Sequence, residues 1–329
     1  MKKIIAVVSG GFSGEAEVSF NSANMVMSNL DPERYTPYQV VISDENWKVL
    51  HNGADFPLDK NDFSFSHEGG KVYFDLAFIV IHGTPGEDGK LQGYFDMLGI
   101  PYNSCSAITS GLTFDKYYSN HLVRHFGIDA STSRVIQRGE KFDVSELAET
   151  IGFPCFVKPN KGGSSIGTFK VYKTEELTSA IEAALHEDNE VLVEKFIEGR
   201  EVTCGVFDDG QKLIALPLTE VVSKSDFFDY KAKYTDGAAD EITPARVNEQ
   251  IAKEISETSL FLYKKLKCNG MVRVDYIVRP DNSLYFLEVN TVPGLSKNSI
   301  IPQQARAYGF TDREFFSLII EEALNRRNK

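Results

Sequence analysis

The chain has 329 residues, 42% of them hydrophobic and 25% charged, which is enough for two or three domains with buried cores. Its formal net charge of -12 disfavours nucleic acid and anionic membranes as partners, because phosphate backbones bind clustered Lys and Arg. A local nucleotide site stays compatible with this charge. The four cysteines (Cys105, Cys155, Cys204 and Cys268) form no C-x-x-C pair, so we interpret them as reduced thiols of a cytoplasmic protein rather than metal ligands.

The first hundred residues alternate between strand and helix patterns. The β-branched run at residues 4–8 ends at Gly10 and Gly11, which predicts a buried strand feeding a turn. This run is far too short for a signal peptide or a membrane span. The elements expected next are a helix over 15–30, strands over 36–42 and 75–81, and a helix over 89–98. The alternation predicts a parallel, Rossmann-like N-terminal domain over residues 1–104.

A smaller α+β domain is expected over residues 105–199. It opens with an amphipathic helix pattern over 113–126 and contains a glycine-rich loop at 162–167. The other elements expected here are strands over 154–158, 168–172 and 190–195 and a helix over 174–186.

The third unit is expected over residues 200–329. The elements predicted in it are strands over 201–207, 212–217, 271–278 and 284–289, a long helix over 247–266, and a helical end. Between these elements, the polar and aromatic segment 220–245 reads as one long loop. Loops of this length are usually lids or binding loops, and its aromatic residues argue against simple disorder. We therefore expect a lid.

The strongest chemical signal lies in the last two predicted strands. Alternate residues of a strand share a face, so Arg273 and Asp275 point one way, as do Glu288 and Asn290. Their apolar neighbours Val274, Leu287 and Val289 are then expected on the opposite face. If the strands pair as a hairpin across residues 280–283, three oxygen ligands converge beside one guanidinium. Two carboxylates and an amide oxygen suit Mg²⁺, while the alternative interpretation is a surface cluster of salt bridges.

The glycine loop carries a second signal. Its glycines let backbone N–H groups approach a phosphate, and the hydroxyls of Ser164 and Ser165 add donors. Neither the Walker A pattern nor the dinucleotide fingerprint fits, because a strand follows the loop instead of a helix. Lys158 precedes the loop and Glu194-Lys195 ends the next apolar strand, so two lysines could grip a polyphosphate from two sides. The alternative is a plain hairpin turn with solvated lysines.

Two loops are expected at the carboxyl edge of the N-terminal sheet, where open sheets bind ligands. In the first, Glu15 could receive a substrate ammonium group, whereas Glu17 fits a role as partner of the helix dipole. In the second, His82 opens the stretch HGTPGEDG. This histidine is either a substrate-binding residue or a structural one.

These pieces, in this order, resemble the D-alanine–D-alanine ligase family over nearly the whole chain. The stretches HGTPGEDGKLQG (82–93) and NTVPG (290–294) are specific to that family, whereas the glycine loop and the carboxylates alone indicate only an ATP-grasp protein. The other matching segments are GGFSGEAEVS (10–19), FDK (114–116), FVKPNKGGSSIG (156–167), VLVEKFIEG (191–199), FDYKAKY (228–234) and RVDY (273–276). The resemblance implies a Rossmann-like (preATP-grasp) domain followed by a two-lobed ATP-grasp fold, α/β and α+β in class.

The resemblance also implies a reaction. ATP would activate one D-alanine as an acyl phosphate for attack by a second, in peptidoglycan precursor synthesis by a cytoplasmic homodimer with two Mg²⁺, which Mn²⁺ can replace. The residues implied at ATP are Lys116, Lys158, Lys195 and Lys233 on the phosphates, Ser164 and Ser165 in the loop, Glu194 and the backbone of Ile197 at adenine, and Glu201 at the ribose.

The remaining roles implied by the resemblance concern the metal and the amino acids. Asp275, Glu288 and Asn290 would bind the Mg²⁺ ions. Glu15 would bind the ammonium group of the first D-alanine, with His82 nearby, and Ser299 would bind the carboxylate of the second D-alanine, with Lys233 close to it. Arg273 and the Gly294 N–H would stabilise the oxyanion. Glu15, Ser164 and Tyr234 would form a hydrogen-bonded set that closes the lid.

Alternatives remain for the identity of the second substrate and for the functional class of the protein. Relatives that use D-lactate lack the tyrosine at the position of Tyr234, so its presence favours D-alanine. Phe228 stands where relatives often carry tyrosine, which puts one hydroxyl contact of the lid in doubt. The competing hypotheses are another ATP-grasp ligase, such as a D-alanine–D-lactate ligase, a non-catalytic ATP-binding protein, and a dehydrogenase. The last is disfavoured by the glycine spacing near residue 10.

Overall fold

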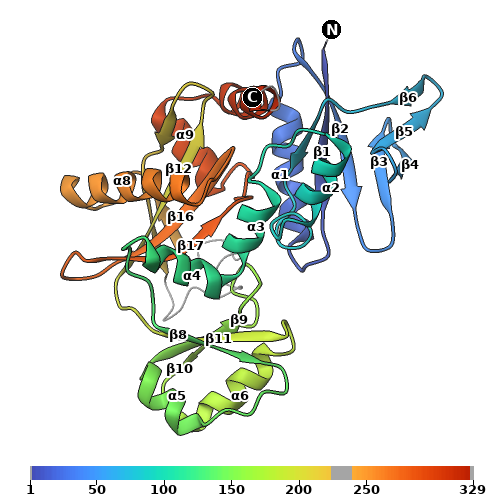
Figure 1. Ribbon diagram of the computed structural model, residues 1–329. Helices are drawn as coiled ribbons and strands as arrows, with labels where there is room; N and C mark the ends of the chain where they lie inside the picture. The colour runs from blue at the N-terminus through green and yellow to red at the C-terminus, as the bar shows by residue number, and fades with distance from the viewer. Residues whose placement is uncertain (1, 224–238, 327–329) are drawn as a thin grey trace.

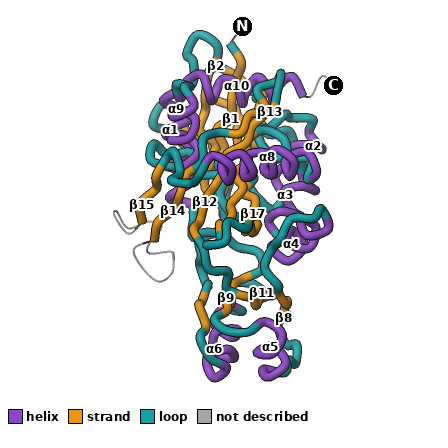
Figure 2. The backbone as a smooth tube through the Cα atoms, turned by 90° about the vertical axis from the view of Figure 1, so that its left-hand side faces the viewer, coloured by secondary structure: helices purple, strands orange, loops and turns teal. Residues whose placement is uncertain are grey.

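The computed structural model describes residues 2–223 and 239–326 of the chain. Within these residues three sheets have seven, four and six strands, in chain order. In Figure 1 the N-terminal sheet lies at the upper right, the C-terminal sheet at the upper left, and the four-stranded sheet at the bottom. Figure 2 shows the bottom lobe joined to the remainder of the molecule through loops.

The N-terminal sheet is parallel over three strands at one end and antiparallel over the rest. Strand β1 (Lys3–Gly10) pairs in parallel with β2 (Tyr35–Ile42) and β7 (Leu76–Ile79), which confirms the predicted βαβ core. Four short antiparallel strands extend the sheet beyond β2, and we did not predict them. They are β3 (Trp47–His51), β4 (Ala54–Asp59), β5 (Ser64–His67) and β6 (Gly70–Val72). Their polar residues hide the alternation that marks a half-buried strand.

An apolar core joins the N-terminal sheet to the end of the chain. Helix α1 (Ala16–Asn29) contacts α10 (Asp312–Arg326), and both pack near β1 and β7. Phe78 of β7 meets Phe316 of α10 edge to face, with ring centroids 6.2 Å apart. Because this core is buried and shared by the two parts, it fixes the N-terminal loops relative to the C-terminal sheet.

The helix predicted over residues 113–126 is confirmed over residues 116–125, but the predicted start belongs to a separate helix over residues 107–114 that we did not predict. Helix α3 (Ala107–Phe114) ends at Asp115, whose extended backbone also begins α4 (Lys116–His125). The Asp115 side chain accepts a hydrogen bond from the Tyr118 N–H and thereby caps the new helix. Both helices contact β17 (Leu284–Asn290), and α3 also contacts α2 (Lys90–Leu98).

The bottom lobe is an antiparallel sheet with strand order β10-β9-β11-β8. Two helices pack against this sheet and fill its core with Leu147, Ile181 and their neighbours. The elements are β8 (Ser133–Gln137), α5 (Val144–Ile151), β9 (Cys155–Pro159), β10 (Phe169–Val171), α6 (Thr174–Ala184) and β11 (Glu190–Lys195). Strand β8 and helix α5 were not predicted, whereas the other four elements were.

The C-terminal sheet has the order β15-β14-β12-β16-β17, with β13 paired to β12. Its strands are β12 (Arg200–Asp208), β13 (Leu213–Ala215), β14 (Thr219–Ser223), β15 (Ala239–Ile242), β16 (Met271–Val278) and β17 (Leu284–Asn290). Helix α8 (Glu249–Lys265) packs against β12 and β13, and α9 (Ile300–Tyr308) precedes α10.

The segment predicted as one loop over 220–245 therefore begins and ends in strands. Strands β14 and β15 pair antiparallel, with Glu220 opposite Ile242 and Ser223 opposite Ala239. The polar residues of this segment gave no sign of the two strands. Strands of four or five residues are stabilised mainly by hydrogen bonds and side-chain packing with the neighbouring strands, which the sequence does not display. Phe228, Lys233 and Tyr234 lie outside the described residues.

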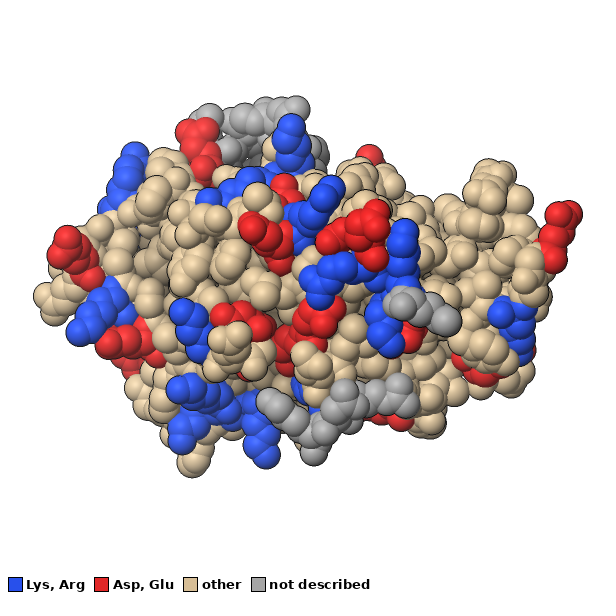
Figure 3. Space-filling view, turned by 90° about the horizontal axis from the view of Figure 1, so that it is seen from above, with Lys and Arg blue, Asp and Glu red and all other residues tan. Residues whose placement is uncertain are grey.

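The state of the cysteines and the distribution of surface charge can be compared with what the composition suggested. All four cysteines are free and buried. On the face seen in Figure 3, basic and acidic side chains are interspersed over most of the surface. Among the residues that the structure describes, no helix combines the length and apolar character needed to cross a bilayer.

Candidate active site

A cavity of 740 Å³ lies between the loops of the N-terminal sheet, the bottom lobe and the β16–β17 hairpin. This volume falls in the range of about 300–1,000 Å³ typical of small-molecule sites. Every predicted site residue in the described part of the chain lines it. These residues are Glu15, His82, Lys116, Lys158, Ser164, Ser165, Glu194, Lys195, Ile197, Glu201, Arg273, Asp275, Glu288, Asn290, Gly294 and Ser299.

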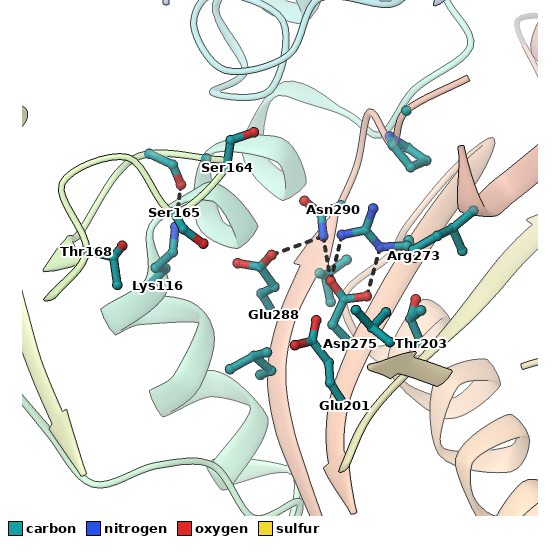
Figure 4. Close-up of a pocket in the computed structure, with 18 of the residues that line it drawn as sticks. Lys116, Ser164, Ser165, Thr168, Glu201, Thr203, Arg273, Asp275, Glu288 and Asn290 are labelled. Atoms are coloured by element: carbon teal, nitrogen blue, oxygen red, sulfur yellow. Dashed lines mark hydrogen bonds and ion pairs between the residues drawn. The ribbon is translucent and has the colours of Figure 1, made fainter. Parts of the chain in front are cut away.

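The hairpin predicted between β16 and β17 forms and brings the four charged and polar residues together (Figure 4). Arg273 lies opposite Asn290, and Asp275 opposite Glu288. The guanidinium of Arg273 grips Asp275 with two hydrogen bonds, of 2.8 Å from Nε and 2.7 Å from Nη2. The Asn290 amide nitrogen donates to Asp275 at 3.1 Å and to Glu288 at 3.3 Å.

One detail of the hairpin differs from the prediction. The register shifts between Asp275 and Tyr276, so Leu287 is the extra residue of a bulge on β17. Val274 and Val289 are buried in the apolar core as expected, but Leu287 is only half-buried and lines the cavity. Simple alternation cannot anticipate such a bulge, because it arises from the pairing of two strands.

The electrostatics of the hairpin depend on close pairing of opposite charges. The Asp275 side chain is only 3% exposed, where an unpaired carboxylate would be costly. Burial works against the charge of Arg273, but the carboxylates of Asp275 and Glu288 outweigh it and raise the pKa of the guanidinium. Arg273 is therefore a permanent cation beside two carboxylates.

The donor set of the hairpin fits a hard divalent cation. Two carboxylates and one amide supply the oxygen atoms that Mg²⁺ prefers. The Asn290 amide nitrogen now faces both carboxylates, and a half-turn of the amide would present its oxygen instead. In the described part of the chain, no group of three or more His, Cys, Asp or Glu side chains is arranged to hold a metal ion.

The glycine loop lies across the cavity from the hairpin (Figure 4). Ser164 and Ser165 both adopt positive φ angles, of 51° and 56°, which turn the backbone sharply. The Lys116 ammonium donates to the Gly162 carbonyl oxygen, so the start of α4 supports the loop. Burial lowers the pKa of Lys116, which favours an anionic partner for this ammonium.

Lys158 and Lys195, the other two described lysines that we predicted at the phosphates, do not lie side by side. Lys158 forms an ion pair with Glu194, the residue implied at adenine. Because β9 and β11 are antiparallel, Lys195 lies opposite Cys155 and not beside Lys158. Both lysines line the cavity, but at different points along the sheet.

The first-domain loops meet the glycine loop at Glu15. The Ser164 hydroxyl donates to the Glu15 carboxylate, so two members of the expected three-residue set are in contact. A Cβ added to Gly163 would lie only 2.7 Å from Glu15 Oε2, which shows how closely the loop backbone approaches this carboxylate. The third member of the set, Tyr234, lies outside the described residues.

Two buried residues beside Glu15 have shifted pKa values. Burial lowers the pKa of His82, so its imidazole is neutral at neutral pH. Burial and the nearby Glu15 carboxylate raise the pKa of Glu87 to about 8. We did not predict Glu87 as a site residue, although it belongs to the stretch HGTPGEDG. The sequence offers one sign of this role, because Glu87 is a carboxylate in a loop that follows a buried strand. In the structure, the Gly83 N–H donates to this carboxylate at 2.7 Å.

The last part of the site is the turn before α9. Ser299 is the N-cap residue of α9, and its Oγ lies 2.8 Å from the Ser296 hydroxyl. A Cβ on Gly294 would lie 2.9 Å from Ser299 Oγ, so the two predicted substrate contacts are adjacent. Backbone N–H groups at a helix start suit a carboxylate.

Comparisons with known proteins cover nearly the whole chain. The family model described as D-ala D-ala ligase N-terminus matches residues 4–105, and the one described as D-ala D-ala ligase C-terminus matches residues 122–321. The D-alanine–D-alanine ligase of Phocaeicola vulgatus is 46% identical over 98% of this chain and 99% of that protein. The enzyme of the same name from Flavobacterium johnsoniae is 43% identical over 98% and 99%.

Solved structures agree with these relatives. The VanG D-Ala:D-Ser ligase from Enterococcus faecalis has a TM-score of 0.87 at 33% identity, covering 98% of this chain and 100% of that one. The D-alanyl-alanine synthetase A from Vibrio cholerae has a TM-score of 0.89 at 26% identity over 98% and 99%. The D-alanine–D-alanine ligase from Bacillus anthracis complexed with ATP has a TM-score of 0.79 at 31% identity over 99% and 98%.

Proposed function

The chain belongs to the D-alanine–D-alanine ligase family, and we propose that it joins two D-alanine molecules to D-alanyl-D-alanine at the expense of ATP. It is an ADP-forming ligase of the ATP-grasp fold that makes a precursor for peptidoglycan. The observation that carries this function is the hairpin in which Arg273, Asp275, Glu288 and Asn290 face one cavity together with Lys116 and the glycine loop.

ATP is needed because a carboxylate is a poor electrophile. Transfer of the γ-phosphoryl group to the first D-alanine makes an acyl phosphate, and the amine of the second D-alanine then displaces phosphate. Transfer requires that negative charge be neutralised around the phosphates. Lys116, Lys158 and Lys195 would supply part of this charge, with support from Ser164 and Ser165 of the loop. Lys233, outside the described residues, is proposed as a fourth lysine.

Two Mg²⁺ ions would neutralise the remaining phosphate charge when bound. Asp275, Glu288 and Asn290 would hold them, as the donor set described above allows. Mn²⁺ has the same preference for oxygen ligands and can substitute. Removal of divalent cations with a chelator should abolish ADP release, and Mg²⁺ or Mn²⁺ should restore it.

The base and the ribose belong where the bottom lobe meets the C-terminal sheet. We propose that adenine lies against Glu194 and the backbone of Ile197, the ribose on Glu201, and the phosphates near Lys195. All four line the same cavity as the hairpin. A nucleotide bound there would extend its phosphates toward Lys158 and the hairpin.

The amino acids belong between the N-terminal loops and the α9 turn. Glu15 would accept the ammonium group of the first D-alanine, beside His82. Ser299, together with Lys233, would bind the second D-alanine at its carboxylate. Arg273 and the Gly294 N–H would stabilise the oxyanion of the tetrahedral intermediate.

Water must be excluded, because it would hydrolyse the acyl phosphate. We propose that the segment 220–245 is the lid, anchored by the β14–β15 ladder. Tyr234 would complete the set with Glu15 and Ser164, whose mutual hydrogen bond supports this arrangement. Tyr234→Phe should relax selectivity toward D-lactate, measured as the ratio of kcat/KM for the two acceptors.

The test of the function is release of ADP and phosphate with different amino acids. We expect turnover with D-alanine alone, none with L-alanine, and little gain when D-lactate is added. Turnover only in the presence of D-lactate or D-serine would instead assign a different second substrate. The curated relatives named above favour D-alanine.

We further propose a cytoplasmic homodimer in which residues 1–104, 105–199 and 200–329 are the functional units. ATP and D-alanine are both cytoplasmic substrates. Large apolar side chains are exposed on three consecutive, contacting helices, including Met97 of α2 (81% exposed) and Ile108 of α3 (72%). Such a surface is what a second copy would cover. Sedimentation of Ile108→Lys should show monomers where the unmodified chain shows dimers.

A further inference from the structure

Ser22 lies where helix α1 meets the loop that carries Gly294. Its side chain is fully buried, at 0% exposure, and the reaction described above gives it no role. Its Oγ accepts a hydrogen bond of 3.1 Å from the Leu295 N–H, and lies 3.5 Å from Nε2 of His82. One hydroxyl thus connects α1, the loop at His82 and the turn before α9.

The hydrogen bonds of His82 define its tautomer. Its carbonyl accepts from the Ser13 hydroxyl at 3.1 Å, and its ring shares a backbone hydrogen bond with Val292. A neutral imidazole has one N–H and one lone pair. Because the Leu295 N–H already donates to Ser22 Oγ, the hydroxyl hydrogen can be directed at Nε2. An Nδ1–H tautomer then satisfies both contacts, since its ring N–H is left to face the Val292 backbone.

These two contacts enclose the oxyanion donor. Val292 comes two residues before Gly294, and Leu295 follows it directly. The Val292 carbonyl is held by His82, and the Leu295 N–H is held by Ser22. Pro293 between them has a fixed φ angle. With both flanks held, the Gly294 N–H has little freedom to turn.

We propose that Ser22 is a positioning residue, which fixes the Nδ1–H tautomer of His82 and, through Val292 and Leu295, aims the Gly294 N–H at the developing oxyanion. The inference deepens the proposed function and rests on it. Oxyanion donors act only when they are aimed before the reaction, and small displacements reduce turnover strongly. Ser22 is not a catalytic residue, because it acts through the loop and touches no substrate.

The kinetic test compares Ser22→Ala with a matched buried serine. Ser110 of α3 is also 0% exposed, and its hydroxyl donates to the Cys105 carbonyl at 3.3 Å, outside the residues that line the cavity. Ser22→Ala should lower kcat about tenfold while KM for ATP changes less than about twofold, because a misaimed donor weakens only the transition state. Ser110→Ala should keep kcat, with a comparable change in melting temperature.

The second measurement does not depend on activity. The ¹⁵N shifts of the His82 ring distinguish the Nδ1–H and Nε2–H tautomers in the unliganded protein. We expect the Nδ1–H tautomer in the unmodified chain and in Ser110→Ala, and a mixture in Ser22→Ala.

The outcomes separate the two proposals. If the unmodified chain releases no ADP with D-alanine, the proposed function fails, while the ring shifts still report on Ser22. If the unmodified chain is active but Ser22→Ala matches Ser110→Ala in kcat, or its His82 tautomer is unchanged, the positioning role is overturned.

Discussion

The β16–β17 hairpin and the loops around Glu15 both bury carboxylates, but they stabilise them in different ways. On the hairpin, Asp275 is paired through two hydrogen bonds with the guanidinium of Arg273. In the loops, the Glu15 carboxylate accepts from the Ser164 hydroxyl, and Glu87 accepts from the Gly83 N–H. The hairpin therefore pairs its carboxylate with a fixed cation, while in the loops burial and the neighbouring Glu15 carboxylate raise the pKa of Glu87.

The two regions also differ in how their geometry is set. Pairing of β16 with β17 sets which side chains lie opposite each other, as Asp275 and Glu288 do. The loops instead rely on close backbone approach, as Gly163 beside Glu15 shows. Changes of charge should therefore matter most on the hairpin, and changes of shape most in the loops.

The largest effect is expected from removing the hairpin cation. Arg273→Ala deletes an oxyanion donor and leaves the buried Asp275 without its bidentate partner, so kcat for ADP release should fall by about 10² or more. Arg279→Ala is the matched control, since Arg279 ends the same hairpin but pairs with Asp281 at an exposed site. Near-normal turnover of Arg273→Ala would remove the oxyanion role.

A shape change in the glycine loop should have the next largest effect. Gly163→Ala places a Cβ 2.7 Å from Glu15 Oε2, which must displace the carboxylate. We expect KM for D-alanine to rise by about tenfold, since one lost ionic contact costs on the order of 1.4 kcal/mol. Gly162→Ala is the control, because its Cβ would meet Pro159 at 3.6 Å, an ordinary contact. Equal kinetics of the two variants would contradict this role of loop shape.

The smallest effect concerns protonation of Glu87. Its pKa is raised to about 8 by burial and by Glu15, so folding favours the protonated form. This contribution to stability is complete below the unfolded pKa of about 4.5 and is lost as pH rises through about 8. Glu87→Gln stays neutral, so between pH 5 and pH 9 its melting temperature should fall by about 3 °C less than that of the unmodified chain.

The control for this measurement is Glu45→Gln, which changes an exposed carboxylate. It should follow the pH dependence of the unmodified chain. Parallel melting curves for Glu87→Gln and the unmodified chain would show that Glu87 is ionised in the folded state at neutral pH.

Local patterns were enough for much of the fold and for the residues that line the cavity. The β-branched residues before Gly10 predicted strand β1. The alternation of polar and apolar residues around Asp275 and Glu288 predicted a β-hairpin with one polar face. These features depend on periodicity within a few residues, which a sequence displays directly. The same holds for the family motifs that indicated the reaction.

Tertiary contacts decided the rest. The bulge at Leu287, the break between α3 and α4 and the β14–β15 ladder each depend on a partner segment. Glu87 became a site residue only through burial beside Glu15, and Ser22 only because α1 packs against a turn 273 residues later. Burial, pKa and long-range hydrogen bonds are properties of packed neighbours, so the sequence determined which groups are present and the fold decided which of them meet.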